Sequence, residues 1–206
     1  MIKAVIFDLG SVLASSEWLL VYGKISKKSK IPEEKVRNIV NSLVRKWSVA
    51  EIDEKGFWEE FKIQTGVNLP EEFTKDFWSK TYKKWSKDIK ESWDILVELK
   101  AKGIRLALLS NTIEPHALAN EEMGRFKRLR DIGVEAFVLS FKERLRKPDP
   151  KIYEVMLKKL NLPAKACAFI DDLLENIEAA KRLGMQGIHF QNPEQLREDL
   201  IKIGLL

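Results

Sequence analysis

The sequence has little cysteine and little histidine, and both shortages restrict the chemistry that is open to it. Cys167 is the single cysteine among 206 residues, so no internal disulfide can form and a reducing compartment is expected. The two histidines, His116 and His189, leave few candidates for a base beside a serine nucleophile, and no Gly-x-Ser-x-Gly motif is present. A serine hydrolase is therefore poorly supported.

Long apolar runs, internal repeats and low-complexity linkers are also missing from the sequence. No apolar run approaches the roughly 18–20 residues that a membrane span requires, and Asp8 interrupts the first apolar stretch too early for a signal peptide. The hydrophobic fraction of 45% and the charged fraction of 33% are ordinary for a folded core with a small accessory domain. We expect a cytoplasmic protein with no membrane partner.

The formal net charge of +5 raises the question of a nucleic-acid partner. The basic residues are interleaved with acidic ones, as where Lys27 and Lys28 precede Glu33 and Glu34. This pattern is more typical of solvated helix faces than of a nucleic-acid surface. We expect no nucleic-acid partner, and the sequence leaves the oligomeric state open.

Five short apolar runs predict buried strands, because each is too short for a helix and several are rich in β-branched residues. The runs cover residues 2–7, 104–109, 136–139, 166–170 and 187–190. Helices fit between them, most clearly at 90–102, 150–160 and 174–183. Alternating strands and helices predict an α/β fold, with a Rossmann-like parallel sheet covered by helices on both faces.

Residues 15–89 differ in character from the rest and predict only helices. We expect helices from about 33 to 47, from 53 to 64 and from 70 to 85. The chain would then consist of a Rossmann-like core, residues 1–14 and 90–206, and an all-helical cap inserted after the first strand. Open parallel sheets bind ligands at the carboxyl edge of their strands, so a cap inserted there is expected to act as a lid.

Polar residues follow four of the predicted strands. Asp8 follows the first, Ser110 and Asn111 the second, and Asp171 and Asp172 the fourth; Lys147 lies after the third, just before the helix that Pro150 opens. Each of these alone is ordinary turn or helix-start chemistry. Together they predict a magnesium site, because carboxylates from neighbouring strands suit Mg²⁺. A lysine can then balance charge while hydroxyl and backbone N–H donors bind phosphoryl oxygens.

The order of these motifs resembles the haloacid dehalogenase-like superfamily, most of whose members are phosphatases. The four segments that carry the resemblance are Val5-Ile6-Phe7-Asp8-Leu9-Gly10-Ser11-Val12-Leu13, Leu108-Leu109-Ser110-Asn111-Thr112, Lys147-Pro148-Asp149-Pro150-Lys151-Ile152-Tyr153 and Phe169-Ile170-Asp171-Asp172-Leu173-Leu174-Glu175-Asn176. Within the superfamily the chain is similar to bacterial glucose-1-phosphate phosphatases and to the phosphatase domain of bifunctional soluble epoxide hydrolases.

The resemblance implies a role for each matching residue. Asp8 would attack phosphorus to form an aspartyl-phosphate, while Ser110 and Asn111 would bind the transferring group. Lys147 would hold Asp8 and the phosphoryl oxygens together. Mg²⁺ would be bound by Asp8, Asp172 and the backbone carbonyl of Gly10, with Asp171 in a supporting position. The implied substrate is a small phosphorylated metabolite, a phosphomonoester for which a sugar phosphate is one candidate.

The chain departs from the family pattern at Gly10, where an aspartate usually acts as general acid and then base. General acid–base catalysis contributes about 10²–10⁴ in rate, so the loss is substantial. Some of the resembled phosphatases begin with the same Asp-Leu-Gly. Two alternatives stay open: a catalytically weak or inactive protein that binds a phosphorylated ligand or a partner, and a haloacid dehalogenase. The Asp171-Asp172 pair disfavours the dehalogenase, which needs no metal.

The remaining candidates for chemistry are given structural interpretations. Four tryptophans of the cap helices should mainly pack between helices, although one of them, or Trp18, could line a substrate pocket: Trp47, Trp58, Trp78 and Trp85. His116, six residues after Ser110, could border the pocket, but we expect it in a surface loop. His189 and Cys167 lie inside strand runs and are expected to be structural.

Overall fold

The computed structural model describes residues 1–15 and 17–206, and its centre is a five-stranded sheet. The strands are in the order β3-β2-β1-β4-β5, and every neighbouring pair is parallel. They are β1 (Ala4–Phe7), β2 (Arg105–Ser110), β3 (Val134–Leu139), β4 (Cys167–Asp171) and β5 (Gln186–His189). Each strand overlaps one of the five apolar runs of the sequence. The strand predictions are confirmed.

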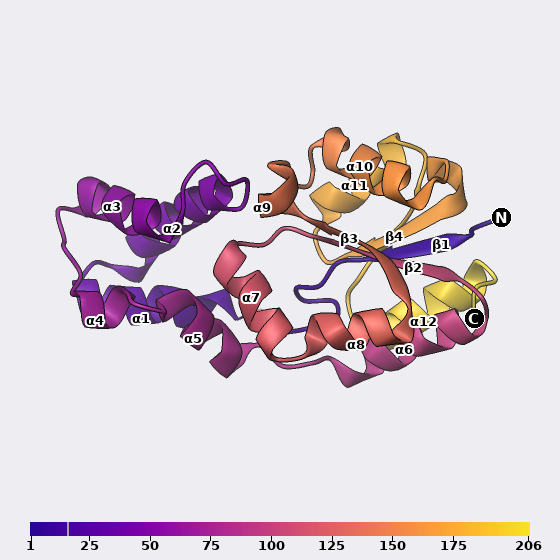
Figure 1. Ribbon diagram of the computed structural model, residues 1–206, viewed down its shortest axis with the longest axis horizontal. Helices are drawn as coiled ribbons and strands as arrows, with labels where there is room; N and C mark the ends of the chain where they lie inside the picture. The colour runs from indigo at the N-terminus through magenta and orange to yellow at the C-terminus, as the bar shows by residue number, and fades with distance from the viewer. Residues whose placement is uncertain (16) are drawn as a thin grey trace.

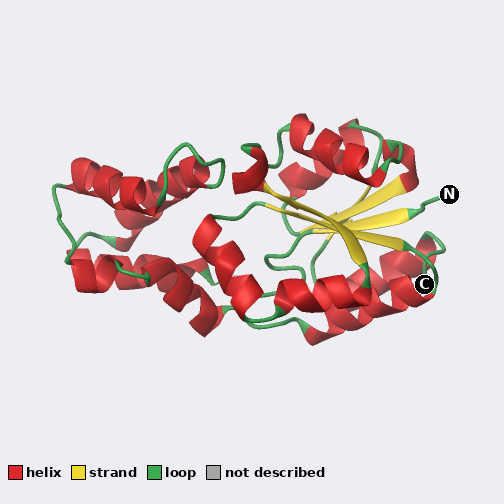
Figure 2. Cartoon of the chain, viewed as in Figure 1, coloured by secondary structure: helices red, strands yellow, loops and turns green. Residues whose placement is uncertain are grey.

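Helices cover both faces of the sheet (Figures 1 and 2). Side chains alternate across β1, so that Phe7 packs in one cluster with Trp93, and Ile6 packs in the other cluster with Tyr153. The core helices are α6 (Lys90–Ala101), α7 (Glu114–Glu122), α8 (Arg125–Ile132), α9 (Ser140–Glu143), α10 (Pro150–Leu160), the 3₁₀ helix η1 (Ala164–Ala166), α11 (Leu174–Arg182) and α12 (Pro193–Lys202). This is the Rossmann-like fold that the sequence predicts.

The segment between β1 and α6 is helical and has an apolar cluster of its own. Its helices are α1 (Trp18–Ser29), α2 (Glu33–Trp47), α3 (Glu54–Thr65), α4 (Glu71–Thr74) and α5 (Phe77–Trp85). Figure 1 shows them beyond the carboxyl ends of the strands, opposite the two chain termini. The all-helical cap after the first strand is confirmed, while the exact domain borders at residues 14/15 and 89/90 stay a prediction.

Two local features show how the cap sequence sets its helices. Asp53 caps α3, because its carboxylate accepts a hydrogen bond from the Gly56 N–H at 2.8 Å. The single helix expected over 70–85 is wrong, since it is broken between α4 and α5. At the break Lys75 is extended, with ψ of 121°, and Asp76 is left-handed, with φ of 57°. Aspartate tolerates this conformation, so no glycine or proline marks the break in the sequence.

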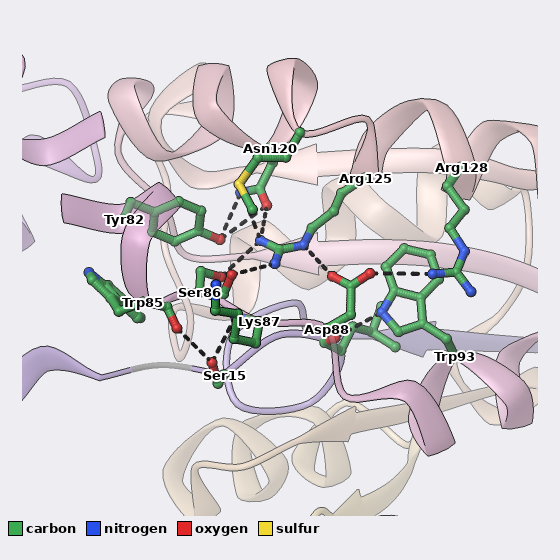
Figure 3. A network of polar contacts seen from close by, with 12 residues as sticks. Ser15, Tyr82, Trp85, Ser86, Lys87, Asp88, Trp93, Asn120, Arg125 and Arg128 are labelled. Carbon is green, nitrogen blue, oxygen red and sulfur yellow. Dashed lines mark hydrogen bonds and ion pairs between the residues drawn. The ribbon is translucent and has the colours of Figure 1, made fainter. Parts of the chain in front are cut away.

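The two segments that connect cap and core lie side by side. The Ser15 hydroxyl donates to the Trp85 carbonyl at 3.1 Å and accepts from the Lys87 N–H at 2.9 Å. Close by, the Trp93 indole N–H donates to the Leu13 carbonyl at 2.9 Å. Figure 3 shows these contacts around Ser15 and Trp85. The connections leave and re-enter the core at one place.

A buried arginine ties the returning connection to the core. Arg125 of α8 is only 4% exposed, and its guanidinium contacts the Asp88 carboxylate at 2.6 Å and the Ser86 carbonyl at 2.8 Å. The same group donates to the Asn120 side chain at 3.0 Å (Figure 3). We refer to these four residues, Ser86, Asp88, Asn120 and Arg125, as the cap joint. Charge-assisted hydrogen bonds are strong, so the joint holds the connection that returns from the cap against α7 and α8 of the core.

Candidate active site

Three carboxylates meet at the carboxyl edge of the two central strands. Asp8 follows β1 and its N–H donates to the Ile170 carbonyl of β4 at 2.9 Å, while Asp171 ends β4 and Asp172 comes next. One ligand oxygen from each of Asp8, Asp171 and Asp172 can be chosen so that all three lie within 4.8 Å of one another. The parallel pairing of β1 and β4 therefore brings together acids that are far apart in the sequence.

Lys147 reaches into this group from the loop before α10. Its ammonium lies 2.9 Å from Asp8 Oδ1, 2.6 Å from Asp171 Oδ2 and 2.9 Å from the Leu109 carbonyl oxygen. An ammonium has three hydrogens to donate, so these contacts can occupy all of them. The side chain is 1% exposed. Lys147 is thus a fixed cation between two acids.

Asn111 holds the backbone that carries this lysine. Its side-chain amide donates to the Lys147 carbonyl at 3.0 Å, and its side-chain oxygen accepts from the Lys147 N–H at 2.9 Å. Ser110 comes immediately before it, buried at the end of β2. The structure thus brings both residues to the edge where Asp8 lies, and their binding of a phosphoryl group stays a prediction.

Asp171 supports the site from beneath. Its Oδ2 contacts Lys147, and its Oδ1 accepts hydrogen bonds from the Leu173 N–H at 2.9 Å and from the Asn176 side chain at 2.8 Å. It is fully buried, whereas Asp8 and Asp172 line a cavity above it. The two acids open to a ligand are therefore Asp8 and Asp172. Asn176 is a supporting residue that the sequence interpretation missed, although it lies within the fourth motif.

Burial dominates the electrostatics of these groups. It raises the pKa of Asp8 to about 7, an effect that Lys147 opposes and the charge of Asp171 reinforces. Burial and Asp171 also raise the pKa of Asp172. Burial alone would lower the pKa of Lys147, but Asp8 and Asp171 outweigh it and raise that pKa, so the amine stays protonated. Three acids then face one ammonium, and a divalent cation would favour the charged forms of these acids.

The donor set fits Mg²⁺, which prefers oxygen ligands and keeps several waters. Asp8 and Asp172 offer carboxylate oxygens. Within residues 1–15 and 17–206, the Gly10 carbonyl accepts no hydrogen bond from a backbone N–H. A Cβ placed on Gly10 would meet no atom within 4 Å, so the space beside the site is open. These three groups are the ones that would hold the ion.

A cavity of about 480 Å³ lies between this edge and the cap. Trp18 and Tyr22 of α1 line it together with Asn41 and Arg45 of α2, and Arg146 lines it from the core. The volume falls in the range of small-molecule sites. Trp18 thus faces the cavity, while Trp47, Trp78 and Trp85 are buried in the cap cluster, as expected for packing residues.

His116 departs from the sequence-based expectation. It lies on α7 and is 6% exposed, so its assignment to a surface loop is wrong. The short α7 turns its ring inward against the cap, where it stacks on Tyr82 with the ring centroids 4.4 Å apart. Burial lowers the pKa of His116 to about 3, so the ring is neutral. His189 lies on β5 with its Nε2 3.0 Å from the Asp172 carbonyl oxygen, and Cys167 is buried at the start of β4.

Comparison with known proteins agrees with this geometry. Residues 2–184 match the family described as haloacid dehalogenase-like hydrolase. The chain belongs to this family. A hydrolase of the family from Porphyromonas gingivalis has a TM-score of 0.79 at 22% identity, covering 98% of each chain. A family enzyme from Bacteroides thetaiotaomicron, in complex with magnesium and inorganic phosphate, has a TM-score of 0.72 at 20% identity, covering 93% of this chain and 96% of that one.

Among curated proteins, a sesquiterpene phosphatase of Aspergillus oryzae is 38% identical over 95 residues, which are 46% of each chain. The matches to the first curated relatives span less than half of those proteins' length. Among the described residues, no helix is both long enough and apolar enough to cross a membrane.

Proposed function

We propose that this hydrolase is a magnesium-dependent phosphatase that acts on a small phosphomonoester through an aspartyl-phosphate on Asp8. One observation carries the proposal: Asp8 lies on the floor of the cavity, 2.9 Å from a buried lysine and within 4.8 Å of a ligand oxygen on Asp172. The phosphatase among the relatives and the magnesium and phosphate bound to a structural neighbour support it.

In the first step the Asp8 carboxylate attacks phosphorus. The Oδ–P bond forms while the bond from phosphorus to the ester oxygen breaks, and the electron pair leaves with that oxygen. Lys147 holds Asp8 in place and balances negative charge, and Asp171 keeps the lysine protonated. The ion that Asp8, Asp172 and the Gly10 carbonyl would hold supplies charge neutralisation and orientation of the phosphoryl group.

In the second step a water molecule attacks the same phosphorus, and the Oδ–P bond breaks to restore the Asp8 carboxylate. Proton transfer is the weak point of both steps. Gly10 has no side chain to protonate the departing oxygen or to accept a proton from the water, so solvent serves both purposes. We expect turnover to favour esters whose oxygen leaves without a proton, such as aryl phosphates, over alkyl phosphates.

Gly10 also supports a second candidate function, a protein that binds phosphorylated ligands and turns them over weakly or not at all. The buried pairing of Lys147 with Asp8 supports the enzyme instead, since a binding protein needs no carboxylate where the phosphate would approach. Attack of Asp8 on carbon, as in a dehalogenase, needs no metal ion and would give the Asp172 carboxylate no role.

The test is phosphate release from a panel of phosphomonoesters, with Mg²⁺ and with EDTA. The Asp8→Asn protein should lose turnover while it still binds phosphate esters, and Asp131→Asn, the same change at an exposed position, should not. Binding without release, in the wild type with Mg²⁺, would favour the second candidate. Halide release from haloacids in the presence of EDTA would favour the dehalogenase.

A further inference from the structure

Two arginines line the active-site cavity without a carboxylate partner. Arg45 lies in the last turn of α2 in the cap, and Arg146 directly precedes Lys147 in the core. Neither arginine forms an ion pair with any residue of the described chain, 1–15 and 17–206. Both guanidinium groups therefore face the cavity without a protein carboxylate to neutralise them in the described residues.

The Arg146 guanidinium is half-buried and incompletely satisfied. Its Nη1 is buried and has no hydrogen-bond partner among the described residues. A buried charged donor without a partner is unfavourable, and a second cation nearby adds to the cost. Burial and the charge of Arg45 lower the pKa of Arg146, and the exposed Glu175 only partly offsets them. An anion bound between the two guanidinium groups would accept hydrogen bonds from Arg146 and offset the repulsion between the two cations.

Arg45 and Arg146 line the same cavity as Asp8 and Asp172, but neither arginine forms an ion pair with these acids in the described residues, whereas Lys147 pairs with Asp8. The charges that act on Arg146 are those of Arg45 and Glu175. The charges that act on Asp8 are those of Lys147, Asp171 and Asp172. Besides Lys147, which is paired with Asp8 and Asp171, the cavity lining therefore offers two cations that are still available to a ligand.

We propose that Arg45 and Arg146 form a second anion subsite, which selects phosphomonoesters that carry another negative group, a carboxylate or a second phosphate. The inference rests on the proposed phosphatase function and names its substrate class. Guanidinium groups bind carboxylate and phosphate oxygens in pairs, so either anion fits the same donors. Because one arginine comes from the cap and the other from the core, the anion would also bridge the two across the cavity.

Matched substrates test the subsite. 3-Phosphoglycerate and glycerol 3-phosphate differ in a terminal carboxylate, and fructose 1,6-bisphosphate and fructose 6-phosphate differ in a second phosphate. The wild type should prefer the more anionic member of at least one pair, and the preferred pair identifies which anion binds. In Arg146→Gln and Arg45→Gln, kcat/KM for that member should fall by about ten- to hundredfold, as for a lost charge-assisted hydrogen bond. Glycerol 3-phosphate or fructose 6-phosphate should change by less than about threefold.

Lys46→Gln is the matched control, because it removes the same charge from the next position of α2 outside the cavity lining. It should leave the preference unchanged. Equal losses on both members of a pair in Arg146→Gln would overturn the proposal, since the arginine would then serve the transferring phosphate. A wild type without any preference would overturn it as well.

Binding to the Asp8→Asn protein separates this inference from the proposed function. In calorimetric titrations with Mg²⁺ present, the more anionic member of a pair should bind more tightly, and adding Arg146→Gln should remove that difference. If the wild type releases phosphate from no substrate, p-nitrophenyl phosphate included, the phosphatase proposal fails, while this titration still decides whether the subsite exists.

Discussion

Replacing Lys147 with methionine tests whether this lysine is what allows two buried acids to exist side by side. Methionine keeps the length and apolar stem of the side chain but removes the ammonium 2.9 Å from Asp8 and 2.6 Å from Asp171. Asp171 has no exposure to solvent, so water cannot replace the lost cation. Removing one partner of a buried ion pair costs about 3–5 kcal/mol.

The loss of folding stability in Lys147→Met should increase as pH rises. Without the lysine, nothing opposes the burial that already raises the pKa of Asp8 to about 7 from 3.8. An acid whose folded pKa lies above its unfolded value stabilises the folded state at low pH and loses that contribution as pH rises through the folded pKa. The variant should therefore be less destabilised at about pH 5 than above about pH 8, where the unfolded acids are fully charged and the folded acids have no cation beside them.

Urea unfolding of the metal-free proteins at these two pH values measures the effect. The double variant Lys147→Met/Asp171→Asn removes one of the two acids and should recover part of the lost stability, although not the phosphatase activity. It also keeps the test usable if the single variant does not fold at high pH. A single variant as stable as wild type above about pH 8 would refute the reasoning, because the acids would then not need the ammonium.

Three further predictions concern the missing acid, the cap joint and the buried histidine. Gly10→Asp has room for its side chain, because a Cβ at this position meets no atom within 4 Å. In this variant the turnover of alkyl phosphates should rise by at least about tenfold, while that of aryl phosphates should change little. Unchanged rates for both classes of substrate would contradict this prediction. Arg125→Met leaves the Ser86 carbonyl without its charged donor and the Asp88 carboxylate with Arg128 alone, so the free energy of unfolding measured in urea should fall by about 3 kcal/mol, and no fall would contradict the role given to the cap joint. His116 has its pKa lowered from 6.5 to about 3, so the wild type should lose stability as pH falls through this interval, by about 2 kcal/mol at about pH 5. His116→Phe should remove that contribution, and parallel stability curves for the two proteins would show that it does not exist.

The sheet and the centre of the site follow from the sequence because both depend on local patterns. Short apolar runs are limited to buried strands, and parallel strands place their carboxyl ends at one edge. Asp8, Lys147 and Asp172 could therefore be expected to meet before any coordinates were known. The motif pattern indicates only a supporting position for Asp171, and its contacts in the structure are buried.

What the sequence did not predict depends on contacts between distant segments. The inward orientation of His116 results from packing of α7 against the cap, which no local pattern encodes. The cavity position of Arg45 depends on how α2 is rotated over the sheet edge, and that of Arg146 on the path of the loop before α10. The cap joint likewise unites residues from α8 and from the connection at 86–88.

Trapping the proposed covalent intermediate shows whether Asp8 is the nucleophile. The wild type is mixed with Mg²⁺ and p-nitrophenyl phosphate, quenched, reduced with borohydride and digested for mass spectrometry. Reduction of an aspartyl-phosphate yields homoserine, and because Gly10 supplies no base for its hydrolysis, the intermediate should accumulate. We expect homoserine at position 8 alone. Phosphate release with position 8 unmodified, or modification at another residue, would contradict it.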